Sequence, residues 1–175
     1  MLRSRNFIAG TSLLVVVALA GSAQSSTLVQ TQLIGVKGAT VLSFVSQYLP
    51  SEVRALQPEL KSKAEEMLRS SGMSIPADPD QYLSIDVTGN AVSTDLCSNA
   101  FMLRVVVAFS EPVKLSRLPR HRLPNNSTLD TWEEAYQDVV NRADLERIVT
   151  TQVREAVQLF IDTVESVNRG EKATK

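Results

Sequence analysis

The sequence predicts an α+β fold, a two-layer sandwich in which a mainly antiparallel sheet of three or four strands carries two helices on one face. In the middle of the chain apolar residues alternate with polar ones, which is typical of strands. On either side of this region, apolar residues recur at helical spacing. Short links between strands favour antiparallel pairing, and two amphipathic helices need an apolar sheet face to cover.

The first strand and the first helix are expected in the segment before residue 75. Strand-forming residues are frequent from Ala39 to Tyr48, and Pro50 closes that segment. Pro58 suits the first turn of a helix, where its missing N–H costs nothing, and Gly72 suits its C-terminal cap. The apolar positions of this helix share one face and are Leu60, Ala64, Met67 and Leu68.

Two strands are expected next. Leu83, Ile85 and Val87 alternate with polar residues, and Thr88-Gly89-Asn90 is expected to end that strand. The second strand is the strongest, and its five apolar residues on one face are Phe101, Leu103, Val105, Val107 and Phe109. Its other face carries Met102, Arg104, Val106, Ala108 and Ser110, which predicts partial cover there. Pro112 cannot donate to a ladder and is expected at a bulge or an edge position, before alternation resumes at Val113.

The segment 129–140 fits two structures. Thr131 to Glu134 forms a capping box, and Trp132, Ala135, Tyr136, Val139 and Val140 have helical spacing. The alternative is a returning strand through Leu129 and Trp132, because a long β-strand usually needs an antiparallel neighbour. The residues alone leave both open.

The last element is expected to be a long amphipathic helix that covers the sheet. Its apolar stripe is continuous and consists of Leu145, Ile148, Val149, Val153, Ala156, Val157, Phe160, Ile161 and Val164. Asn168-Arg169-Gly170 is expected to end it. The predicted order is therefore strand, helix, strand, strand, a fourth short strand or helix, and a closing helix.

The N-terminal segment has the three parts of a secretory signal. Arg3 and Arg5 precede an apolar run from Phe7 to Ala20, which at about 14 residues is shorter than the ~20 that span a bilayer. Small residues follow, so cleavage is expected before Gln24, with cleavage after Ala20 or an uncleaved anchor as alternatives. Ser22 stands where a lipoprotein signal has its lipid-modified cysteine, which argues against lipidation.

The predicted organisation is a signal peptide at 1–23, a flexible lead-in at 24–38, one α+β domain at 39–168 and a polar tail at 169–175. The formal net charge of −1 gives no indication of nucleic-acid binding. Cys97 is the only cysteine, so an internal disulfide is excluded, and it is either buried or paired between chains. His121 is the only histidine and lies between two arginines, which disfavours a catalytic triad and a zinc site. No cofactor or metal is expected.

One basic cluster is the candidate contact site. It consists of Lys114, Arg117, Arg120, His121 and Arg122, in a chain of negative net charge. Such a cluster is typical of a solvated hairpin tip. The alternative is contact with anionic lipid head groups or an acidic partner, which would depend on salt.

Several motifs in order resemble a family of small secreted bacterial proteins without an assigned function. They are "LKSKAEEMLRSSGM", "YLSIDV", "VVVAFSEPVKLSR", the Thr-Trp pair and the closing "IDTVESVN". The resemblance covers most of residues 39–168 and implies that Trp132 lies on a returning strand, although "EEAYQDVV" departs from the pattern. The layout is also similar to helix-sheet envelope domains such as the N-terminal domain of TolB. The resemblance transfers no site residues.

The function expected from these features is that of an exported, soluble, non-enzymatic binding or assembly-accessory module in the periplasm or the secreted space. Its partner would be another envelope protein or an anionic surface. A module that binds anionic lipid or anions through residues 114–122 is the first alternative. A hydrolase with an unrecognised site is the second.

Overall fold

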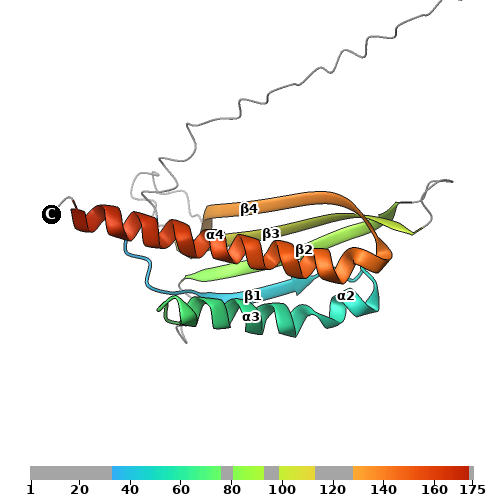
Figure 1. Ribbon diagram of the computed structural model, residues 1–175, viewed down its shortest axis with the longest axis horizontal. Coiled ribbons are helices and arrows are strands. Elements are labelled where there is room, and N and C mark those ends of the chain that lie inside the picture. The colour runs from blue at the N-terminus through green and yellow to red at the C-terminus, as the bar shows by residue number, and fades with distance from the viewer. Residues whose placement is uncertain (1–32, 76–80, 93–98, 113–127, 174–175) are drawn as a thin grey trace, which may run out of the picture.

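The computed structural model describes residues 33–75, 81–92, 99–112 and 128–173. Figure 1 shows the strands side by side with the long helices next to them. The elements are β1 (Thr40–Val45), α2 (Ser51–Ala55), α3 (Gln57–Ser70), β2 (Tyr82–Val92), β3 (Ala100–Pro112), β4 (Thr128–Asn141), η1 (Arg142–Asp144) and α4 (Leu145–Ala173). The α+β fold predicted from the sequence is therefore confirmed.

The four strands form one mixed sheet in the order β1-β2-β3-β4. β1 and β2 are parallel, whereas β2–β3 and β3–β4 are antiparallel. The parallel pair follows from the connection between its strands, since α2 and α3 carry the chain back before β2 begins. The sequence order of the strands is thus also their order across the sheet.

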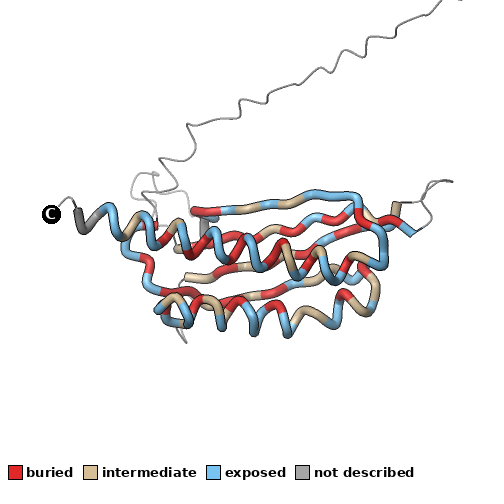
Figure 2. The backbone as a smooth tube through the Cα atoms, in the orientation of Figure 1, coloured by how far each residue is buried: buried red, intermediate tan, exposed pale blue. Residues whose placement is uncertain are grey.

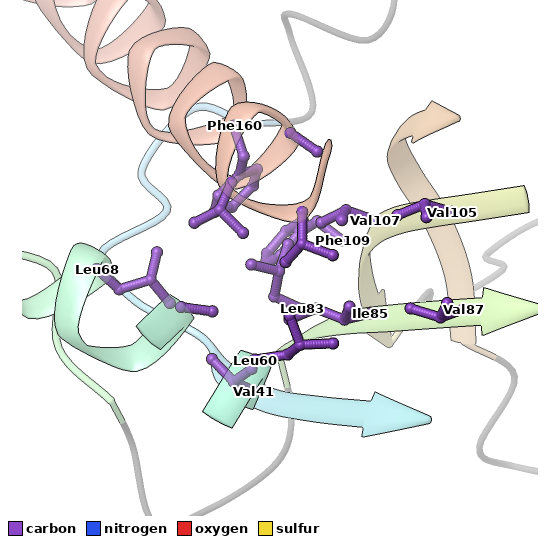
Figure 3. Packing of buried hydrophobic residues seen from close by; sticks show 14 of the residues in the cluster. Val41, Leu60, Leu68, Leu83, Ile85, Val87, Val105, Val107, Phe109 and Phe160 are labelled. Carbon is purple, nitrogen blue, oxygen red and sulfur yellow. The ribbon is translucent and has the colours of Figure 1, made fainter. Parts of the chain in front are cut away.

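Both long helices pack on the same face of the sheet and against each other. α3 contacts β1, and α4 contacts β3 and β4. Figure 2 shows buried residues alternating along the strands and recurring along the helices. In Figure 3, Phe160 of α4 points toward the strand residues around Phe109, while Leu60 and Leu68 of α3 approach Val41 and Leu83. The core therefore lies between one sheet face and the two helices.

α3 begins and ends as its sequence predicts. Pro58 occupies its first turn, where no intrahelical N–H is needed. At its C-terminus Gly72 has a positive φ of 82°, and its N–H donates to the Arg69 carbonyl. The next N–H, from Met73, donates to the Leu68 carbonyl at 2.9 Å, which completes a Schellman motif.

The segment that fitted two structures is a strand. β4 pairs with β3 along its length, with one register shift at Phe109/Ser110. Trp132 is buried and its ring lies 5.2 Å from that of Phe160, which itself lies 5.2 Å from Phe109. The helical spacing around Trp132 does not produce a helix. In the strand, alternate residues point to the same face of the sheet, and this places Trp132 and Val140 in the core.

Three predicted boundaries are wrong. β2 does not end at Gly89 but continues to Val92. Glycine suits this position inside the strand because the chain packs closely there, and an added Cβ would lie 2.9 Å from Leu49 Cδ2. The packed part starts before residue 39, since Leu33 and Val36 are buried in the core. α4 continues past Gly170 to Ala173. Pro112, in contrast, closes β3 beyond the last pair with β2, as its missing N–H requires.

Candidate functional site

The basic cluster predicted from the sequence lies outside the described residues. Lys114, Arg117, Arg120, His121 and Arg122 all fall within 113–127, and the single cysteine, Cys97, falls within 93–98. The continuation of the strand pattern after Pro112 lies there as well. The structure therefore assigns neither a contact nor a burial state to any of these residues.

The candidate site is the sheet face opposite α3 and α4, which we call the open face. In the described part of the chain, every helix that contacts the sheet packs on the other face. Residues on the open face follow one another across the strands in registered rows. At one end lies Tyr82–Ser110–Asp130, in the middle Phe44–Asp86–Val106–Ala135, and at the far end Asn90–Met102–Val139.

Large apolar side chains are exposed on this face. Phe44 is 54% exposed, Met102 50% and Val139 67%. Half-buried Leu42 lies beside Phe44 on β1, and half-buried Val106 shares the row of Phe44. The polar row Thr88–Arg104–Gln137 separates Phe44 from the adjacent pair Met102 and Val139. These three make up half of the large apolar side chains that are exposed in the described part of the chain. Grouped apolar side chains on a surface are a feature of interaction sites, whereas single ones are ordinary.

Carboxylates lie at the other end of the open face. Asp130 accepts a hydrogen bond from the Ser110 hydroxyl, and Glu133 is 3.7 Å from the Arg104 guanidinium. Asp86 lies in the middle row between Phe44 and Val106. Among the described residues, no lysine or arginine forms an ion pair with Asp86 or Asp130. Arg104 is the only described cation on this face; it lies between the middle and far rows, and Glu133 already engages it.

The environment of Asp86 disfavours its charged form. Partial burial raises the pKa of its carboxyl above the ordinary value, and the negative charge of Asp130 raises it further. A hydrogen bond with the Ser84 side chain opposes this increase without cancelling it. The neighbours in register, Phe44 and Val106, explain the burial. A cation placed over this position would therefore meet an unmatched carboxylate.

The helix side of the molecule carries hollows along the seam between α3 and α4. One of about 640 Å³ lies near the C-terminal ends of both helices and is lined by Gly72, Met73, Asn168 and their neighbours. Two smaller ones, about 310 and 230 Å³, continue it along the seam. The Asn168 side chain is already used, since it accepts from Gly35 N–H at 2.9 Å and donates to the Val36 carbonyl. This amide thus ties the start of the packed chain to α4.

One polar side chain of α4, Gln152, is buried against the sheet. The Gln152 amide nitrogen donates to an Asp138 oxygen at 2.6 Å, while the Gln152 oxygen has no hydrogen-bond partner. The Ser43 hydroxyl on β1 is also buried without a partner. Neither atom lines one of the hollows along the helix seam. These groups are features of the core rather than of a ligand site.

The open face combines apolar and acidic side chains. Within ranges 33–75, 81–92, 99–112 and 128–173, no three side chains of His, Cys, Asp or Glu are grouped so as to hold a metal ion. Across those same ranges, no helix combines the length and the apolar character that crossing a membrane requires. An apolar and acidic sheet face can bind a complementary surface, and this is what its side chains support best.

Sequence reasoning missed the open face as a site. The signal was present in β3, where Met102, Val106 and Ala108 alternate with the core residues and predicted cover on both faces. In the sequence, Phe44 is one of several strand formers between Ala39 and Tyr48, and nothing in that run sets it apart. Its exposure follows from the parallel pairing of β1 with β2, which sets its direction.

No family model matches the chain, and no curated protein matches it.

Proposed function

We propose that this chain is an exported, non-enzymatic binding module of the cell envelope or the secreted space, and that its open face receives a partner protein. The observation that carries the proposal is the exposure of Phe44, Met102 and Val139 on a face without a helix in the described residues. Burying such side chains against a partner releases roughly 25 cal/mol per Å² of apolar surface. Leaving them in water yields no such gain.

Export is supported by the N-terminal pattern. The charged start, the short apolar run and the small residues before Gln24 are together typical of a cleaved secretory signal. Mass spectrometry of the intact protein from the producing cells tests this part. A chain that begins at Gln24 is expected, and a mass that retains Met1 to Ala23 contradicts it.

Site-specific photo-crosslinking tests the binding role of the open face. Met102 is replaced by p-benzoylphenylalanine in the full chain, and the producing cells are irradiated. We expect an adduct heavier than the chain, because Met102 lies at the centre of the far row. Adding Phe44→Ser is expected to weaken the adduct, since it removes apolar contact area from the same face.

Ser62 provides the matched control. It is exposed on α3, on the opposite side of the molecule, and the same photo-reactive residue there is expected to give no such adduct. Equal adducts from both positions, or none from Met102, would contradict a binding role for the open face.

A further inference from the structure

The charge of the open face carries information about its partner. Its carboxylates are Asp86, Asp130 and Glu133, and its only cation among the described residues is Arg104, which contacts Glu133. Asp86 and Asp130 thus remain without a cation from the described chain. An anionic membrane surface or a nucleic acid would be repelled at this end of the face.

The apolar and acidic groups are arranged along the strands. Ser110 and Asp130 mark one end, Phe44 and Asp86 share the middle row, and Met102 and Val139 mark the other end. From Ser110 to Met102 is eight residues of β3, or about 27 Å at the rise of a strand. An extended segment of about eight residues has this length.

A second copy of the chain fits this arrangement poorly. If two open faces meet with their acidic ends together, Asp130 lies over its own counterpart. If they meet in the opposite direction, Asp130 lies over Met102 and Val139, and a carboxylate is buried against apolar side chains. Either arrangement leaves the acidic groups unmatched.

Resting on the proposed function above, we infer that the partner presents an amphipathic polypeptide segment, basic at one end and apolar along the rest. Its lysines or arginines lie over Asp86 and Asp130, and its apolar side chains cover Phe44, Met102 and Val139. The positive charges of the basic end offset the repulsion between the two aspartates, and the apolar part removes the exposed apolar side chains from water. The raised pKa of Asp86, caused first by burial and to a smaller extent by the charge of Asp130, agrees with this role.

Binding of a defined peptide tests the inference. The probe is a ten-residue peptide with three lysines at one end followed by alternating leucine and serine, titrated into the purified protein by calorimetry. The matched peptide carries glutamate in place of lysine. We expect measurable binding of the lysine peptide and at least tenfold weaker binding of the glutamate peptide.

Three double variants locate the binding. Asp86→Asn with Asp130→Asn, and Phe44→Ser with Val139→Ser, are each expected to weaken the lysine peptide at least tenfold. Asparagine keeps the oxygen that accepts from Ser110, so the first pair spares that contact. The control, Glu59→Gln with Glu155→Gln, removes two exposed charges from the helix layer and is expected to change the affinity less than twofold. Equal weakening by all three would overturn the inference.

Failure of the inference can be told apart from failure of the proposed function. If the adduct from position 102 persists unchanged in the Asp86→Asn, Asp130→Asn variant, the open face binds a partner of other chemistry and only the inference is wrong. If position 102 gives no adduct, the binding role itself fails. An adduct of twice the chain mass, or binding to phosphatidylglycerol vesicles that Phe44→Ser with Val139→Ser abolishes, also overturns the inference.

Discussion

The two faces of this sheet are built from alternate residues of the same four strands, yet they have different chemistry. On the helix face, Leu83, Ile85 and Val87 of β2 are fully buried. On the open face the same strand presents Ser84, Asp86 and further polar residues, which are half-buried or exposed. The strand geometry is the same for both, so the difference comes from what covers each face. We therefore expect stability to depend mainly on the helix face, and the proposed recognition to depend on the open face.

The largest expected effect comes from removing an aromatic ring at the centre of the helix face. Phe160 is fully buried, and its ring lies 5.2 Å from those of Phe109 and Trp132. Phe160→Ala is expected to lower the free energy of unfolding by about 3–5 kcal/mol, because it leaves a cavity among the rings. Urea unfolding followed by tryptophan fluorescence measures this.

Phe44→Ala is the matched change on the open face. More than half of that side chain is already in water, so a loss of less than about 1 kcal/mol is expected. If both variants lost a similar free energy of unfolding, the open face would be covered in the intact protein, and the proposed difference between the two faces would be wrong.

The second prediction concerns the one glycine of β2. Gly89 lies on the helix face, where an added Cβ would be 2.9 Å from Leu49 Cδ2 and 2.9 Å from the Met102 carbonyl oxygen. Gly89→Ala is expected to destabilise by about 1–3 kcal/mol, because the backbone oxygen cannot move aside as a side chain can. Gly170→Ala in α4 meets nothing within 4 Å and is expected to stabilise by up to about 1 kcal/mol. Thermal unfolding of both variants measures these stability changes. A Gly89→Ala variant as stable as the parent protein would contradict the close packing around Gly89.

Local patterns in the sequence predicted the helix face well and the open face poorly. The stripe of α4, the cap at Gly72 and the alternation in β3 each depend on neighbours a few residues apart, and the structure confirms them. Whether Trp132 belonged to a helix or a strand depended on pairing with β3, a contact between distant residues. The juxtaposition of Asp86 with Phe44 and Asp130 depends on the register of all four strands, which no local pattern contains.

The third prediction compares one serine from each face. Ser43 lies on the helix face with its hydroxyl buried and without a partner, whereas the Ser84 hydroxyl on the open face has two acceptors within reach, the Ala108 carbonyl at 3.5 Å and the Asp86 carboxylate. Ser43→Ala removes an unpaired polar group and is expected to stabilise by up to about 1 kcal/mol. Ser84→Ala is expected to lower the free energy of unfolding slightly, because it removes a hydrogen bond. Urea unfolding of both variants measures the difference, and a loss on Ser43→Ala larger than that on Ser84→Ala would contradict it.

The smallest expected effect is the pH dependence that Asp86 contributes. Burial, followed by the charge of Asp130, raises the pKa of this carboxyl in the folded protein, against the opposing hydrogen bond with Ser84. The described charged groups on the same face are Asp130, Glu133 and Arg104, and none of the described helices packs on this face. Between the ordinary pKa and the raised one, the folded chain holds more protons at this position than the unfolded chain does. The contribution of Asp86 to stability therefore falls as the pH rises through that interval.

Asp86→Asn removes this titration. The variant is expected to be more stable than the parent protein above the raised pKa, and the gain is expected to vanish below the ordinary pKa of aspartate, where both forms are neutral. Urea unfolding of both proteins across pH 3 to 8 measures the difference. A gain that stays constant across that range would show that the amide itself, and not the loss of an unmatched charge, stabilises the variant. In that case the cation assigned to the partner would have no unfavourable charge to neutralise at Asp86, and its place on the open face would depend on Asp130 alone.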